Sequence, residues 1–235
     1  MNYSVVIPLK NEEENVEDLI RELEPVMNSL NKPWELLCID DGSTDNTLNI
    51  LKQLKKSAPY LRILKFDKNY GQTSAFDAGF KAAKGAYIIT LDGDRQNDPN
   101  DIPALLKLAP DYDLVVGWRH QRKDPMSKKI TSKLANWVRG SFCEDGVHDT
   151  GCSLKVYKRD SLKQLKLFHG MHRFLPALFT MEGYKVAEVR VNHRERTRGQ
   201  TKYNFFNRSF NTIADMFAVR WMKSRSLRYK VGEES

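Results

Sequence analysis

The chain of 235 residues lacks any apolar run of about 18 residues, the length that a helix needs to cross a bilayer. Its N-terminal stretch, MNYSVVIPLKNEEEN, has neither the basic nor the apolar region of a signal peptide. The three cysteines, Cys38, Cys143 and Cys152, match neither a zinc-site spacing nor a disulfide framework. We therefore expect a reduced, cytosolic compartment.

Glycine motifs for phosphate binding are missing as well. No G-x-G-x-x-G or Walker-type sequence occurs, which argues against a dinucleotide-dependent enzyme or an NTPase. The chain has no internal repeat and no low-complexity segment. Its hydrophobic content of 40% is enough to form a core. The length fits one large domain, or one domain with an appendage.

The net charge of +8 is concentrated near the end of the chain. Residues 193–230 contain ten Lys or Arg and two acids, whereas residues 1–192 are nearly balanced. A basic segment of this kind favours anionic partners, which include phosphates, nucleic acid and membrane surfaces. A solvated helix face is the alternative interpretation.

Strand-like and helix-like segments alternate along the first half of the chain. This alternation predicts a parallel α/β sheet, and we expect Gly85 to end the third helix-forming segment. A basic loop and helix are expected over residues 119–142. The expected strands are 3–9, 34–40, 61–67, 86–92 and 112–118, and the expected helices are 14–30, 46–57, 71–85 and 101–109.

Polar residues follow every predicted strand. In an open parallel sheet the carboxyl ends of the strands share one edge, and ligands bind there. Three of the five strands end in acids, and carboxylates at one edge repel each other unless a cation lies between them. The residues concerned are Asn11, Glu12, Asp40, Asp41, Asp67, Asn69, Asp92, Asp94 and Arg119.

Asp92 and Asp94 interrupt an apolar run at the end of the fourth predicted strand. A D-x-D triplet is weak support for a metal site by itself, and its place at this sheet edge makes it stronger. A few oxygen ligands suit Mg²⁺ or Mn²⁺, which also bind substrate phosphates. The sequence therefore predicts a divalent cation that holds a diphosphate.

Several ordered motifs resemble those of the family 2 inverting glycosyltransferases with the GT-A fold. They are VVIPLKNEEENV, CIDDGSTDNT, NYGQTSAFDAGFKAAKG and LDGDRQNDP. The later segments DTGCSLKVYKRD, GMHRFLPAL and HRERTRGQTKY are similar to the branch of dolichol-phosphate mannose synthase and bacterial polyprenyl-phosphate glycosyltransferases. The resemblance runs from about residue 3 to 205.

The resemblance implies an α/β fold, with a GT-A Rossmann-like, mostly parallel sheet flanked by helices over residues 1–200. A basic amphipathic segment follows over residues 201–235. Asp40 would contact the base, and Arg95, where the branch often has Leu, would add a cation beside the diphosphate. The implied nucleotide-sugar site comprises Pro8, Asn11, Glu12, Asp40, Asp92, Arg95 and Gln96, and the Mg²⁺ or Mn²⁺ site comprises Asp92, Asp94 and Gln96.

The resemblance also implies a second site, for the phosphate of a polyprenyl acceptor. Asp149 would either orient the donor sugar or serve as a base. From its place in the sequence, the neighbouring His148 either steers that acid or simply belongs to a loop. His172 and His193 are expected to be structural. The implied acceptor residues are Arg119, Lys128, Ser132, Arg196 and Lys202, and the implied catalytic residues are Asp94, Asp149 and Arg119.

Three functions remain open from the sequence. The first is transfer of a sugar from a GDP- or UDP-linked donor to a polyprenyl phosphate at the cytoplasmic membrane face. The second is transfer to a saccharide or protein hydroxyl, which needs a general base. The third is nucleic-acid binding through the basic segment and its aromatic residues, although the acidic edge would repel a nucleic acid.

The segment from 204 to 223 predicts how the chain reaches a lipid acceptor. Its apolar residues recur at helical spacing and are accompanied by basic residues, which fits a helix that lies in an anionic membrane surface. The alternatives are that this face packs on the domain, or on a membrane-spanning partner protein. The face comprises Phe206, Phe210, Ile213, Phe217 and Trp221.

Overall fold

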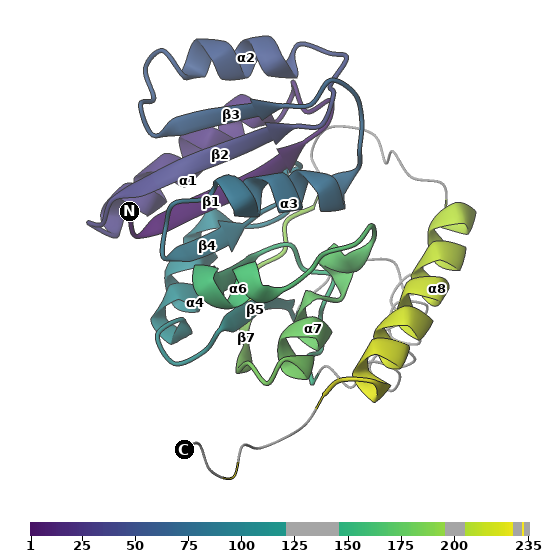
Figure 1. Ribbon diagram of the computed structural model, residues 1–235. Coiled ribbons are helices and arrows are strands. Elements are labelled where there is room, and N and C mark those ends of the chain that lie inside the picture. Colours follow the sequence, from purple (N-terminus) through teal and green to yellow (C-terminus); the bar gives the residue numbers. More distant parts are fainter. Residues whose placement is uncertain (121–145, 196–204, 228–231, 233–235) are drawn as a thin grey trace.

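A sheet of seven strands forms the centre of the protein (Figure 1). The computed structural model describes residues 1–120, 146–195, 205–227 and 232, apart from the side chains of residues 205–211. The strands lie in the order β3-β2-β1-β4-β6-β5-β7. Their bounds are β1 Tyr3–Leu9, β2 Trp34–Asp40, β3 Leu61–Lys65, β4 Tyr87–Thr90, β5 Leu114–Arg119, β6 Lys155–Lys158 and β7 Val186–Val191.

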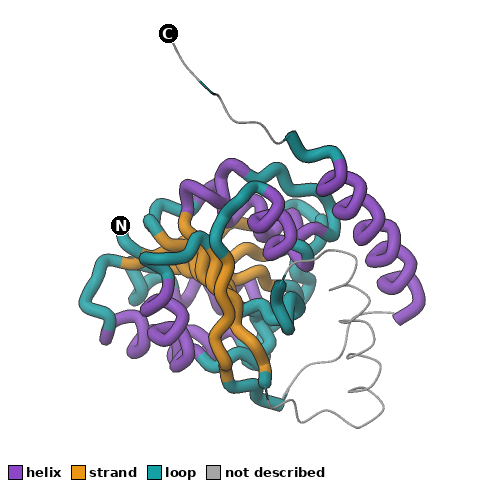
Figure 2. The backbone as a smooth tube through the Cα atoms, turned by 90° about the horizontal axis from the view of Figure 1, so that it is seen from below, coloured by secondary structure: helices purple, strands orange, loops and turns teal. Residues whose placement is uncertain are grey.

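Helices cover both faces of this sheet (Figure 2). Residues alternate along β1, so Val5 and Ile7 pack with α1, α2 and α4, whereas Val6 packs with α3, α6 and α7. Each face therefore has its own apolar core. The helices are α1 Val16–Ser29, α2 Thr47–Leu54, α3 Gln72–Ala82, α4 Ile102–Leu108, α6 Arg159–Gln164, α7 Leu175–Met181 and α8 Phe205–Ser224, with short 3-10 turns η1 Pro99–Asp101 and η2 Met171–Arg173.

One strand, β6, runs against the others. It pairs antiparallel with both β4 and β5, so its first residue, Lys155, lies opposite Thr90 and Val116. The remaining pairs are parallel, which confirms the predicted mostly parallel sheet. Because β6 is reversed, the segment that leads into it reaches the same edge as the carboxyl ends of the other six strands.

The C-terminal helix α8 contacts the body beside α7 (Figure 1). Met216 and Val219 are buried against Phe174 and Ala177. Three residues of the predicted apolar face point away from that contact: Ile213 is 52% exposed, Phe217 58% and Trp221 64%. These three side chains are therefore largely uncovered by the described part of the domain, while the side chains of Phe206 and Phe210 lie outside the described residues. No helix among the described residues is long and apolar enough to span a bilayer.

The prediction that Gly85 ends α3 is wrong. The helix ends at Ala82 and the next residue is extended, while Gly85 is not among the glycines with positive φ. Its lack of a side chain serves close packing instead. A Cβ placed on Gly85 would lie 2.5 Å from the backbone nitrogen of Ser4 and from the carbonyl carbon of Tyr3.

We expect Gly85→Ala to lower the free energy of unfolding by about 1–3 kcal/mol, because the added methyl group meets backbone atoms of β1 that cannot turn away. Urea denaturation measures this change. Gly232→Ala is the control, since no atom lies within 4 Å of its added Cβ. Equal stability of the two variants would contradict the close contact.

Candidate active site

The loops after β1 and β2 interlock at the carboxyl edge of the sheet. The backbone nitrogen of Asn11 donates to Ser43 Oγ at 2.9 Å, and the Asn11 side chain accepts from the nitrogen of Thr44 at 2.8 Å. The nitrogen of Glu12 donates to Thr47 Oγ1 at 2.8 Å. These contacts bring two of the predicted nucleotide-site residues beside the β2 loop. Pro8 also lies at this edge, in register with Ile39.

The two acids at the end of β2 differ in their surroundings. Asp41 accepts hydrogen bonds from the backbone nitrogens of Tyr70 and Gly71, at 2.7 and 2.9 Å, and so holds the loop before α3. Asp40 is fully buried and accepts from the nitrogen of Ser43 through Oδ1. Its Oδ2 has no hydrogen-bond partner among the described residues. A buried acceptor without a donor is costly, so this atom is suited to a donor from a ligand.

The carboxylates predicted to bind metal follow β4. Asp92 is half-buried, and its Oδ1 accepts from Gln72 Nε2 at 2.9 Å, at the start of α3. Burial and the charge of Asp94 raise the pKa of Asp92, although Ser153, Lys155 and Arg119 act in the opposite direction. The nitrogen of Gln96 donates to Asp94 Oδ1 at 3.2 Å, which makes a tight turn beyond the strand.

A half-buried carboxylate whose pKa is raised by a neighbouring carboxylate belongs to a site that a cation would stabilise. Among the described residues, no group of three or more His, Cys, Asp or Glu side chains is arranged to hold a metal ion. Asp92, Asp94 and the amide of Gln96 could supply some oxygens, and a diphosphate and water would complete the shell. This sparse donor set is the one that Mg²⁺ commonly uses.

Arg95 does not take the place that the sequence predicts for it. It has a left-handed backbone with φ of 61°, and its guanidinium pairs with Asp18 at 2.7 Å and with Glu22, both on α1. The structure thus directs this cation to a helix surface, where two acids already compensate its charge. Its expected position beside a diphosphate would require both ion pairs to break.

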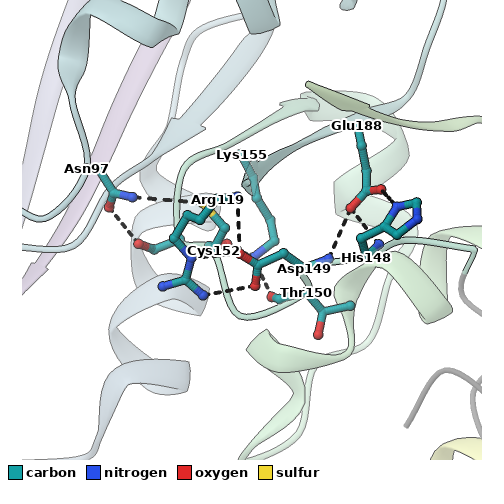
Figure 3. A network of polar contacts seen from close by, with 9 residues as sticks. Asn97, Arg119, His148, Asp149, Thr150, Cys152, Lys155 and Glu188 are labelled. Carbon is teal, nitrogen blue, oxygen red and sulfur yellow. Dashed lines mark hydrogen bonds and ion pairs between the residues drawn. The ribbon is translucent and has the colours of Figure 1, made fainter. Parts of the chain in front are cut away.

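Arg119 and Asp149 form a bidentate ion pair (Figure 3). Arg119 Nε lies 2.7 Å from Asp149 Oδ2, and Nη2 lies 2.9 Å from Oδ1. The two side chains are only 13% and 7% exposed. Burial alone would lower the pKa of Arg119, but the hydrogen bonds and charge of Asp149 raise it above its usual value. The sequence gives no signal for this pair, because Arg119 ends β5 whereas Asp149 lies 30 residues later, in the segment before β6.

Further residues tie this ion pair to the carboxylates after β4. Asn97 Oδ1 accepts from the nitrogen of Asp92 at 3.2 Å and from Ser153 Oγ at 2.7 Å. Its Nδ2 lies 3.9 Å from the sulfur of Cys152 (Figure 3). A small polar side chain therefore joins the two acidic segments. Asn97 belongs to the LDGDRQNDP motif, but the motif alone did not indicate this role.

The histidines have varied surroundings. His172 Nδ1 lies 2.7 Å from Thr73 Oγ1, a contact that fits the expected structural role, and His193 forms a β-bridge with Asn97. The ring of His148 pairs with Glu188 at 2.7 Å, so any effect of this ring on Asp149 passes through Glu188.

The predicted acceptor residues Lys128, Ser132, Arg196 and Lys202 lie outside the described residues.

Comparison with known proteins identifies relatives of this chain. A model of the family described as Glycosyl transferase family 2 matches residues 4–166. Dodecaprenyl-phosphate galacturonate synthase from Rhizobium johnstonii is 40% identical over 236 residues, with 98% of this chain and 68% of that protein covered. Undecaprenyl-phosphate 4-deoxy-4-formamido-L-arabinose transferase from Salmonella choleraesuis is 36% identical, with 91% and 65% covered. The chain thus spans about two thirds of the length of these relatives.

Solved structures share the fold at low sequence identity. Glucosyl-3-phosphoglycerate synthase from Mycobacterium tuberculosis, in complex with Mn²⁺, UDP-glucose and phosphoglyceric acid, superposes with a TM-score of 0.75. It is 19% identical, and the match covers 94% of this chain and 80% of that one. The same enzyme with Mg²⁺ and UDP gives a TM-score of 0.72, also at 19% identity, with 94% and 79% covered.

The sheet and its acidic carboxyl edge have the architecture of the GT-A glycosyltransferases, as the sequence predicts. The chain belongs to glycosyl transferase family 2. The predicted likeness to the polyprenyl-phosphate branch is confirmed by the relatives, whose names place them there.

We expect Arg119→Met to lower the free energy of unfolding by about 3–5 kcal/mol, because it leaves the buried Asp149 carboxylate without its partner. Urea denaturation measures the loss. Arg21→Met breaks the exposed pair with Glu17 on α1 and should cost less than about 1 kcal/mol. An equal loss of unfolding free energy in the two variants would show that the Arg119–Asp149 pair contributes no more than an exposed pair, which contradicts the prediction.

Proposed function

We propose that this protein transfers a sugar, with inversion, from a nucleoside diphosphate to a polyprenyl phosphate. The observation that carries the proposal is the placement of Asp92 and Asp94 at the same sheet edge as the buried Arg119–Asp149 pair. The names of the relatives support the acceptor, since both act on a polyprenyl phosphate. Donors linked to UDP or GDP are both compatible with the described site.

The donor nucleotide would lie over the ends of β1 and β2. Asp40 Oδ2, which has no partner among the described residues, would accept a hydrogen bond from an N–H group of the base. Asn11 and Glu12 would border the same pocket, because their backbones are fixed to the β2 loop. The diphosphate would then extend toward Asp92 and Asp94.

A divalent cation, Mg²⁺ or Mn²⁺, fits the carboxylates after β4. Asp92, Asp94 and Gln96 would hold it, and Gln72 would orient Asp92 through its hydrogen bond. When bound, the cation neutralises charge that develops on the leaving diphosphate. Arg95 would take no part in this as long as its two ion pairs on α1 persist.

In the reaction, an oxygen of the acceptor phosphate forms a bond to the anomeric carbon while the bond to the diphosphate breaks. The nucleoside diphosphate leaves with the bonding electrons. An anionic phosphate needs no strong general base. Asp149 is therefore better suited to orient the donor sugar, since protonation of its carboxylate would disrupt the bidentate pair with Arg119.

The acceptor phosphate would need cations near this carboxylate. Two nitrogens of Arg119 hold Asp149, which leaves Nη1 to contact a phosphate. Lys128, Ser132, Arg196 and Lys202 stay predicted acceptor residues, as the resemblance implies. This arrangement would let Arg119 place the sugar and the acceptor relative to each other.

Residues 201–235 would attach the enzyme to the cytoplasmic face of a membrane. The exposed side chains of Ile213, Phe217 and Trp221 form a stripe at helical spacing along α8, and Arg220 is exposed beside it. Aromatic residues flanked by cations suit the interface of an anionic leaflet. A membrane-spanning partner protein is the other surface that this stripe could bind.

Purified protein should be tested with several nucleotide sugars and with undecaprenyl phosphate as acceptor. The donors are GDP-mannose, UDP-glucose, UDP-N-acetylglucosamine, UDP-galacturonic acid and a UDP-linked 4-deoxy-4-formamido-L-arabinose. Formation of a lipid-linked sugar from one donor supports the proposal. Transfer to a saccharide or peptide hydroxyl, with none to the lipid phosphate, would contradict it.

We expect Asp94→Asn to reduce transfer by at least about 100-fold, because the amide removes one of the two charges that would hold the cation. The circular dichroism spectrum and the unfolding midpoint should stay unchanged, since Asp94 lies beyond the end of β4. Chelation with EDTA should stop the wild-type enzyme, and added Mn²⁺ should restore it. Undiminished transfer in excess EDTA would argue against a catalytic metal.

For the membrane, we expect the wild-type protein to co-sediment with vesicles of phosphatidylglycerol and phosphatidylethanolamine at low salt. Phe217→Glu with Trp221→Glu should release it, because both place a charge on the exposed stripe. Asn49→Glu with Gln53→Glu is the matched control, with the same spacing and charge change on the exposed side of α2. Binding of the control but not of the α8 variant assigns the contact to α8. If the wild-type protein ignores the vesicles, attachment through α8 to lipid is wrong.

A further inference from the structure

The backbone turn that carries Asp149 is held on one side by Glu188 of β7 (Figure 3). Glu188 Oε1 accepts from the backbone nitrogens of His148 and Asp149, at 2.7 and 3.1 Å. Its Oε2 lies 2.7 Å from Nδ1 of His148. One carboxylate, only 12% exposed, thus satisfies two successive main-chain N–H groups, including that of Asp149 itself.

Lys155 holds the same turn from the other side. Its side chain is almost completely buried, and Nζ donates to the carbonyl oxygen of Thr150 at 3.1 Å and to that of Cys152. Burial lowers the pKa of Lys155, and the charges of Asp149 and Asp92 oppose that effect. An ammonium group beneath a turn therefore interacts with both acidic segments of the site.

Two charged side chains satisfy the main-chain groups of this turn. Neutral side chains or water can satisfy main-chain groups, whereas burial of a carboxylate and an ammonium is costly unless each is well paired. Here the carboxylate of Glu188 accepts from N–H groups, and the ammonium of Lys155 donates to C=O groups. Each charge therefore faces the end of the peptide dipole that has the opposite sign. Gly151, within this turn, also leaves space for the ion pair, because a Cβ there would lie 3.2 Å from Arg119 Nη2.

We propose that Glu188 and Lys155 are positioning residues, which clamp the backbone of residues 148–152 so that Asp149 and Arg119 keep a fixed place relative to Asp92. The assignment of Asp149 to the reacting centre rests on the proposed function. The clamp itself rests on the contacts of these two side chains. Asn97 completes the connection, since it joins Ser153 to the backbone of Asp92.

Hydrogen–deuterium exchange tests the clamp without any substrate. Glu188→Leu and Lys155→Met remove the polar heads and keep apolar bulk. We expect the peptide that spans residues 147–152 to exchange at least about tenfold faster in either variant, while peptides from β1 and β2 keep their rates. The controls are Glu182→Leu, at the exposed residue that follows α7, and Lys158→Met, at the far end of β6, where its ammonium faces Asp113. Unchanged protection of residues 147–152 in both test variants would overturn the clamp.

Kinetics test whether the clamp acts through Asp149. Under saturating substrates, Glu188→Leu should reduce kcat about 10- to 100-fold, because displacement of a substrate-orienting group by about 1 Å is sufficient for such a loss. Glu188→Gln keeps an acceptor oxygen for the two N–H groups, so it should restore kcat to within about fivefold of wild type. The affinity for UDP with Mn²⁺, measured by calorimetry, should change less than about twofold in both.

A double-mutant cycle separates positioning from a merely structural role. In an Asp149→Asn background, Glu188→Leu should cause no further loss of kcat beyond about twofold, because its effect passes through the missing carboxylate. Full additivity of the two losses would overturn the proposal. If Lys155→Met does not fold, Lys155→Gln replaces it, because its neutral amide still donates hydrogen bonds but carries no charge.

The two proposals fail in different ways. Absence of sugar transfer by the wild-type protein would count against the proposed function and leave the exchange result intact. Unchanged exchange in the variants would reject the clamp even if the wild-type enzyme transfers sugar efficiently.

Discussion

The reversed direction of β6 is the constraint on which the candidate site depends. In a fully parallel sheet, the segment before a strand lies at the opposite edge from the ligand. Since β6 runs antiparallel between β4 and β5, residues 149–155 instead meet Asp92 and Arg119 at one edge. Every close contact of the Asp149 carboxylate described above follows from that single reversal.

Much of the fold could be predicted because its signals are local. The strands β1 to β5 and helices α1 to α4 follow from hydrophobic periodicity, and Asp92 and Asp94 stand out as charges at the end of an apolar run. The ion pair of Asp149 with Arg119, the buried Lys155 and the diversion of Arg95 to α1 could not be predicted. Each depends on partners distant in the sequence, and nothing local distinguishes a buried lysine from a solvated one.

The charged neighbours of each carboxylate at this edge determine whether that carboxylate can bind a cation. Asp92 and Asp94 repel each other and so favour a cation, whereas the charge of Asp149 is already compensated by Arg119. Close carboxylates thus acquire different chemical roles from their neighbours alone. Asp41 has a structural role, since both of its oxygens accept hydrogen bonds from the backbone of the loop before α3.

The pairing of β7 with β5 limits where the chain can be truncated. The family match ends at residue 166, but Leu175, Leu178 and Phe179 of α7 still belong to the second apolar core, and β7 covers the outer side of β5. A fragment cut at residue 166 would expose an unpaired edge strand and an open core, both of which promote aggregation. The smallest independently folding piece must therefore reach beyond Val191, so recombinant truncations should be placed after that strand.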